Sequence, residues 1–240
     1  MLYSLNQEEE TGESMSRKID VLGIRLDDYT AKDAMKAITE FLKEEMASLV
    51  EVVTAESVMR MTQNEPQRSE SDTMDMIIPG DRAILEAAEV KDEKLLRQAQ
   101  RGDFVKLLFQ YLHKNEANIF LLADTMDEAQ SLENWIQKKY KNIRIAGRMA
   151  VPEGTLSDDM IINLINGAGA ECIIASVTSG RQEEFIFRCR NVLNVKLWIG
   201  ISQAERFFEE KGSLAERIFV FLNQKILKRK AIREKNRRNA

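Results

Sequence analysis

The feature that most constrains the fold is the alternation of short apolar runs with amphipathic stretches of helical length in the second half of the chain. The run IFLLA at 119–123, for example, is followed by DEAQSLENWIQKKY, whose apolar positions recur at helical spacing. Strands that alternate with helices in this way predict a parallel sheet with helices on both faces. We therefore predict an α/β fold that is Rossmann-like, with a mostly parallel sheet covered by helices on both faces.

The first half of the chain follows the same pattern. Strand-like runs occupy residues 19–26, 49–55 and 76–79. Thr30 is a predicted helix N-cap, because Asp33 stands where a capping-box acid would. The polar stretch 86–102 is either a helix or a mobile, lid-like segment, and the residues after it, 104–114, predict an amphipathic helix.

Composition divides the chain into three predicted parts. Residues 1–16 are polar, acidic and aperiodic, which predicts disorder, and residues 17–205 form the α/β domain. Residues 206–240 predict a helical appendage whose end, from Lys225, is rich in Lys and Arg opposed only by Glu234. This appendage is either a basic amphipathic helix on an anionic lipid surface or a last helix packed on the domain with a solvated tail.

Overall composition excludes several classes of protein. The chain has 240 residues, of which 44% are hydrophobic and 31% charged, as in ordinary globular proteins. The net charge of −4 gives no global sign of nucleic-acid binding. No apolar run is long enough to span a bilayer, and the acidic N-terminus does not resemble a signal peptide. We expect a cytoplasmic protein, with peripheral contact to the inner face of the cell membrane as a further expectation.

Candidate site residues follow three of the predicted strands, since parallel α/β sheets bind ligands outside the carboxyl ends of their strands. The loop after Val53 begins with Thr54, Ala55 and Glu56. Asp81, after the strand at 76–79, is either a general base or a turn and N-cap residue. Residues 178–180 precede a helix that opens with Arg181. That helix start is either an anion site for a diphosphate or an ordinary Ser/Gly cap.

Other chemistries find little support in the sequence. Cys172 and Cys189 lie among apolar residues and are predicted to be buried core thiols. The single histidine, His113, lies on a predicted amphipathic helix, and no His/Cys cluster has metal-ligand spacing. Neither GxGxxG nor GxxxxGK[ST] occurs, so no nucleotide-phosphate fingerprint is present. We expect no metal and no cofactor.

The order of segments resembles the WecG/TagA/CpsF family of bacterial glycosyltransferases over roughly residues 18–205. The opening IDVLGIRLDDYT and the following AKDAMKAITEFL match the first strand and helix of that family. VVTAE corresponds to its Thr-x-Asn strand end, IIPGD to its Pro-Asp-Gly loop, and Gly-Arg-Gln-Glu at 180–183 to its Pro-Lys-Gln-Glu motif. WIGIS corresponds to its last strand, which ends in Gly-Val-Gly.

This resemblance implies transfer of an N-acetylhexosamine, such as N-acetylmannosamine, from a UDP-sugar to a polyprenyl-diphosphate-linked acceptor in cell-surface polysaccharide biosynthesis. It implies an inverting hexosyltransferase that needs no metal, with Asp81 as the base. The substrate-binding residues that it implies are Thr54, Glu56, Arg181, Gln182 and Glu183.

Several motif positions depart from the family pattern. Glu56 stands where the family has Asn, and Asp81 is displaced by one position within its loop. Gly180 replaces the proline, only Asp103 fits the family's Arg-Val-x-Gly-x-Asp segment, and residues 204–206 lack its Phe-Asp. The departures support a second hypothesis, a catalytically silent relative that binds a ligand or a partner in a regulatory role. The sequence leaves a homo-oligomer open.

Overall fold

The computed structural model describes residues 18–62, 71–151, 157–177, 181–201 and 204, and for residues 181–184 it describes the backbone alone. The segment 1–16 and the appendage 206–240, both predicted from composition, lie outside the described residues. So do residues 178–180.

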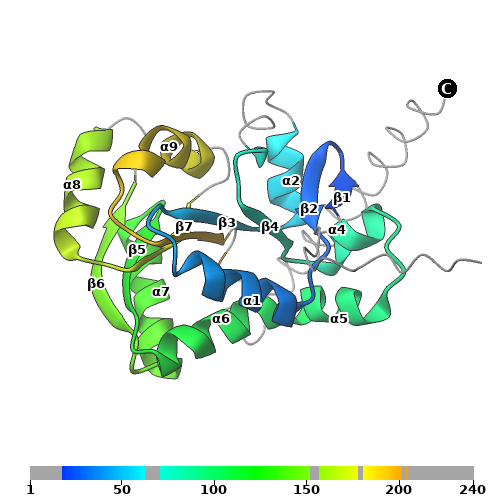
Figure 1. Ribbon diagram of the computed structural model, residues 1–240, viewed down its shortest axis with the longest axis horizontal. Helices are drawn as coiled ribbons and strands as arrows, with labels where there is room; N and C mark the ends of the chain where they lie inside the picture. Colours follow the sequence, from blue (N-terminus) through cyan, green and yellow to red (C-terminus); the bar gives the residue numbers. More distant parts are fainter. Residues whose placement is uncertain (1–17, 63–70, 152–156, 178–180, 202–203, 205–240) are drawn as a thin grey trace, which may run out of the picture.

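A six-stranded parallel sheet forms the centre of the molecule (Figure 1). Its strands lie in the order β4-β3-β8-β7-β5-β6, and every hydrogen-bonded pair is parallel. The strand bounds are β3 Ser48–Val53, β4 Met76–Pro79, β5 Asn118–Ala123, β6 Arg144–Ala150, β7 Cys172–Ser176 and β8 Leu197–Ile201. The predicted α/β fold with a mostly parallel sheet is confirmed.

Helices cover both faces of this sheet, as Figure 1 shows. One apolar core joins the strands to α1, α6 and α7, and the other joins them to α2, α4, α8 and α9. The helix bounds are α1 Ala31–Phe41, α2 Ala55–Met61, α4 Arg82–Ala87, α5 Glu93–Arg101, α6 Asp103–Lys114, α7 Met126–Lys139, α8 Asp158–Ala168 and α9 Arg181–Cys189, with the 3-10 helix η1 at Arg190–Val192.

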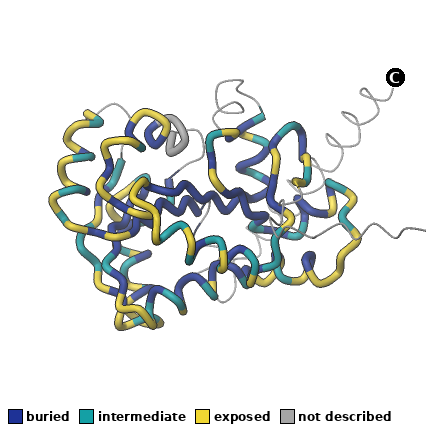
Figure 2. Tube along the Cα trace, in the orientation of Figure 1, coloured by how far each residue is buried: buried dark blue, intermediate teal, exposed yellow. Residues whose placement is uncertain are grey.

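The strands are buried because they carry apolar side chains on both faces. On β3, Val50 and Val52 belong to one core, whereas Leu49 and Val53 belong to the other. Figure 2 shows the central strands buried along their length while the helices expose one side. This two-sided burial explains why the strands read as continuous apolar runs in the sequence.

The run 19–26, predicted as one strand, is instead a hairpin, so that prediction is wrong. Strands β1 (Lys18–Val21) and β2 (Ile24–Asp27) pair antiparallel around Leu22 and Gly23, both of which have positive φ. The hairpin is joined to the edge strand β4 by Asp27, whose Oδ2 accepts a hydrogen bond from Ile77 N at 2.8 Å.

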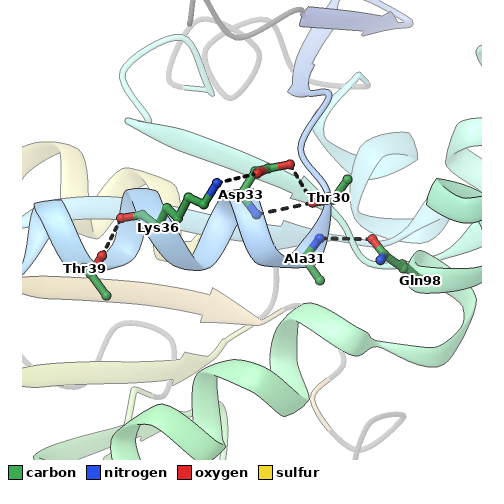
Figure 3. A network of polar contacts seen from close by, with 6 residues as sticks. All are labelled: Thr30, Ala31, Asp33, Lys36, Thr39 and Gln98. Carbon is green, nitrogen blue, oxygen red and sulfur yellow. Dashed lines mark hydrogen bonds and ion pairs between the residues drawn. The ribbon is translucent and has the colours of Figure 1, made fainter. Parts of the chain in front are cut away.

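The start of α1 is capped as predicted (Figure 3). Thr30 is the N-cap, and its Oγ1 accepts a hydrogen bond from Asp33 N at 3.3 Å. The Thr30 hydroxyl also donates to Asp33 Oδ2 at 2.6 Å. This bond, helped by Lys36, lowers the pKa of Asp33. The segment 86–102 contains the helix α5, which begins after the N-cap Asp92 and ends at Gly102 in the left-handed conformation.

Candidate active site

The loops after β3 and β4 touch each other at the carboxyl edge of the sheet. The two strands are neighbours, with Val53 level with Pro79, and Gly80 N donates to Val53 O at 2.7 Å. A Cβ atom at Gly80 would lie 2.9 Å from that same oxygen and 3.0 Å from Val52 Cγ1. Glycine at this position therefore allows the two loops to approach closely.

Asp81 links the starts of two helices at this edge. It is the N-cap of α4, and its Oδ1 accepts from Ile84 N at 3.1 Å. Its Oδ2 accepts from Ala55 N, the first residue of α2, at 2.9 Å. Both donors are N–H groups that the first turn of a helix leaves without an intrahelical partner. Because its carboxylate accepts from Ile84 N at the start of α4, the interpretation of Asp81 as an N-cap is confirmed, and the residue is only 5% exposed.

Thr54 is also a helix cap. It is fully buried, and its Oγ1 accepts from Ser57 N at 3.3 Å while Ser57 Oγ accepts from Thr54 N at 2.7 Å. This reciprocal pair is a capping box at the start of α2. Glu56, in the first turn, forms an ion pair with Arg60 one turn further along the same helix. Both predicted binding residues thus stabilise α2 beside the Asp81 loop.

The third predicted part of the site follows β7, which lies two places from β3 in the sheet. Its carboxyl end is at the same edge, because all the strands are parallel. Arg181 opens α9 directly after the undescribed residues 178–180. The side chains of Arg181, Gln182 and Glu183 lie outside the described part of the structure.

A hollow beside the Asp81 loop lies on the face of the sheet that is covered by α1 and α6. Its volume is about 350 Å³ when the part open to solvent is included, and it is bounded by α5 as well as by Pro79 and Gly80. Its walls are mainly apolar. They include Val52 and Ile78 from the sheet, Leu95 and Ala99 from α5, and Phe104 and Val105 from α6. We call it the α5 hollow.

Three polar side chains also line the α5 hollow: Tyr29, Gln98 and Asp103. Gln98 Oε1 accepts from Ala31 N, the first residue of α1, at 3.1 Å (Figure 3). Asp103 begins α6 and forms an ion pair with Arg101. Sequence reasoning found Asp103 through its motif position, but it missed Tyr29 and Gln98, which line the same hollow because the start of α1 lies beside α5 and α6.

Metal and thiol chemistry have no candidate groups in the described part of the chain. No group of three or more His, Cys, Asp or Glu residues there is arranged to hold a metal ion. Cys172 and Cys189 are buried, as predicted. Burial raises the pKa of the Cys172 thiol to about 12 and that of the Cys189 thiol to about 11. Neither thiol is an activated nucleophile.

Comparison with known sequences decides the family. The profile of the Glycosyl transferase WecG/TagA/CpsF family matches residues 19–230. The chain belongs to this family. The match extends over the whole described sheet and both contacting loops, so the resemblance noted from the sequence motifs is confirmed.

Curated relatives are similar to this chain over most of their length, but their sequence identity to it is low. One is the "N-acetylglucosaminyldiphosphoundecaprenol N-acetyl-beta-D-mannosaminyltransferase" of Staphylococcus aureus strain MRSA252, 22% identical over 212 residues, which are 88% of this chain and 83% of the relative. Proteins with the same name from S. aureus strains NCTC 8325 / PS 47 and COL are 21% identical over the same shares of the two chains.

Among the described helices of this chain, none is both long and apolar enough to cross a membrane.

Proposed function

We propose that this protein transfers an N-acetylhexosamine, with N-acetylmannosamine as the first candidate, from a UDP-sugar to a polyprenyl-diphosphate-linked acceptor in cell-surface polysaccharide biosynthesis. The observation that carries the proposal is the family match across residues 19–230. The names of the relatives specify transfer of N-acetylmannosamine to N-acetylglucosaminyldiphosphoundecaprenol, which supplies the sugar and the class of acceptor.

The proposed site is the carboxyl edge of the sheet, at which β3, β4 and β7 all end. Asp81 takes the proton of the acceptor hydroxyl, whose oxygen attacks the anomeric carbon of the donor sugar. The bond from this carbon to the diphosphate oxygen breaks, UDP leaves, and the anomeric configuration is inverted. The start of α9, with Arg181, Gln182 and Glu183, holds the donor diphosphate through helix N–H groups and positive charge.

Asp81 must change its contacts to act in this way. Both of its oxygens accept backbone N–H groups, and little of the residue reaches solvent. Gly80, which directly precedes it, is the residue best able to absorb a change in backbone conformation. Thr54 and Glu56 stabilise the first turn of α2 beside this loop. Ala55 N, in the same turn, then holds the Asp81 carboxylate in the position that it has before a substrate binds.

A second candidate function rests on the same contacts. The side chains of Asp81 and Thr54 are both engaged in helix caps, as structural residues would be. A catalytically silent relative that binds a sugar nucleotide or a partner protein would keep these caps and perform no transfer.

Product formation separates the two candidates. Purified full-length protein is incubated with UDP-N-acetylmannosamine and a short-chain prenyl-diphosphate N-acetylglucosamine, and the lipid product is measured by mass spectrometry. We expect a product that carries one additional N-acetylhexosamine. Calorimetric binding of UDP-N-acetylmannosamine without product would favour the silent relative. Absence of both binding and product would reject the transferase and a silent relative that binds this sugar nucleotide, and would leave a silent relative that binds a partner protein.

The site of action is proposed on the same basis. A polyprenyl-linked acceptor lies in a membrane, so we propose a cytoplasmic protein that contacts the inner leaflet peripherally. Residues 206–240, whose basic end begins at Lys225, are the proposed contact. Flotation of the full-length protein with anionic vesicles, compared with neutral vesicles, tests this point; equal recovery with both would reject an electrostatic contact.

A further inference from the structure

We infer that the α5 hollow is a subsite for the acetamido group of one of the two sugar substrates. The inference rests on the proposed function and extends it, because none of the residues assigned to catalysis or binding lines this hollow. It adjoins the candidate active site through Pro79 and Gly80, which form part of its wall. A group bound in it would lie next to the loop that carries Asp81.

The charge of the walls excludes a phosphate as the natural occupant. The described residues that line the hollow include no Lys, Arg or His, and the one ionised group among them is the Asp103 carboxylate. The lining offers a diphosphate no cation of its own, because the neighbouring Arg101 is already paired with the Asp103 carboxylate. An uncharged group with hydrogen-bonding atoms and an apolar end suits these walls better.

Gln98 supplies a hydrogen-bond donor. Its amide oxygen must face Ala31 N, since that N–H can only donate, and this fixes the orientation of the amide. The Nε2 group is the other branch of the same amide and lies beside Oε1 in Figure 3. It donates to no acceptor among the described residues, so a ligand carbonyl oxygen can take its hydrogen bond.

Asp103 and the apolar walls complete the match to an acetamido group. One oxygen of Asp103, Oδ2, pairs with Arg101, and the other is able to accept an N–H from a ligand. The side chains of Val52, Ile78 and Leu95 offer apolar surface to a methyl group. An acetamido group has one carbonyl acceptor, one N–H donor and one methyl group, which correspond to these three features.

The substitution Gln98→Glu isolates the ligand contact from the structural one. A glutamate in the same position keeps an oxygen for Ala31 N, and its negative charge is favourable at the start of α1. It removes only the Nε2 donor and places an acceptor against the ligand carbonyl. Gln100→Glu is the matched control, because Gln100 is exposed on the same helix and does not line the hollow.

Binding is measured by calorimetry on the full-length protein with two pairs of probes. The donor pair is UDP-N-acetylmannosamine and UDP-mannose, and the acceptor pair is short-chain prenyl-diphosphate N-acetylglucosamine and prenyl-diphosphate glucose. We expect the wild type to bind the acetylated member of one pair about tenfold more tightly, and Gln98→Glu to reduce this preference to about twofold. The pair that shows the effect identifies which sugar uses the hollow.

A purely structural role of Gln98 predicts a different result. The preference would then persist in Gln98→Glu, and this outcome, or absence of any preference in the wild type, would overturn the inference. Selective ¹⁵N labelling of glutamine gives an independent readout: the Gln98 side-chain signal, assigned by its loss in Gln98→Glu, should shift with the acetylated probe and not with its partner. No shift with either pair would also overturn it.

The outcomes for the subsite and for the proposed function are separable. Transfer activity together with an unchanged preference in Gln98→Glu would reject the subsite and leave the glycosyltransferase assignment intact. A preference that depends on Gln98, found in a protein without transfer activity, would support the subsite and favour the silent relative.

Discussion

Replacing Asp81 by alanine tests whether this carboxylate holds two helices together. The change removes the N-cap of α4, which costs about 1 kcal/mol. It also leaves Ala55 N buried without its acceptor, at a further cost of roughly 1–3 kcal/mol. The sum is about 2–4 kcal/mol, because Asp81 accepts both N–H groups and is almost fully buried.

Thermal unfolding followed by circular dichroism measures this loss. In a chain of 240 residues, about 1 kcal/mol lowers Tm by roughly 2–4 °C, so Asp81→Ala should lower Tm by roughly 4–16 °C. Asp92→Ala is the control, since Asp92 is an exposed N-cap of α5 whose acceptor contacts stay within its own helix. It should lower Tm by about 2–4 °C. Equal shifts for the two variants would refute the bridging role of Asp81.

Two further predictions concern the edge of the sheet and the pair α8–α9. Gly80→Ala should destabilise the protein by about 1–3 kcal/mol in urea denaturation, because its Cβ would press on Val53 O; an unchanged midpoint would show that the two loops can separate freely. Arg188 on α9 lowers the pKa of Asp158 on α8. The contribution of this ion pair to the free energy of unfolding is therefore fully present above the ordinary carboxylate pKa, and it is lost as pH falls through the lowered pKa. The stability difference between wild type and Asp158→Asn should therefore shrink in acid, and a difference independent of pH would contradict the pair.

Much of the fold could be predicted because its determinants are local. Strands buried on both faces produce continuous apolar runs, and the Thr30 cap is encoded within three residues by Asp33. The hairpin at 18–27 was missed because its apolar residues continue through the turn, although Gly23 was a local signal for it. The helix α5 was ambiguous because most of the segment 86–102 is polar, yet Asp92 before the helix and Gly102 after it are ordinary start and stop signals.

The candidate site was harder to predict because its contacts join distant segments. The sequence places Asp81 before a helix, which suffices to suggest a cap on Ile84 N. Its second contact, with Ala55 N, exists only because β3 and β4 are neighbours in the sheet. Tyr29 and Gln98 line the same α5 hollow because Ala31, at the start of α1, is hydrogen-bonded to Gln98 on α5, and no spacing in the sequence encodes this contact.

The most direct test of the proposed site is the initial rate of transfer by Asp81→Asn relative to wild type, measured below the unfolding range of both proteins and normalised to folded protein. Asp92→Asn serves as the matched control, because it makes the same chemical change at another helix N-cap. If Asp81 is the base, its substitution should lower the rate by about 10²-fold or more while the control keeps the wild-type rate. Equal rates for Asp81→Asn and wild type would show that the proton is taken elsewhere and would contradict the proposed centre of the site.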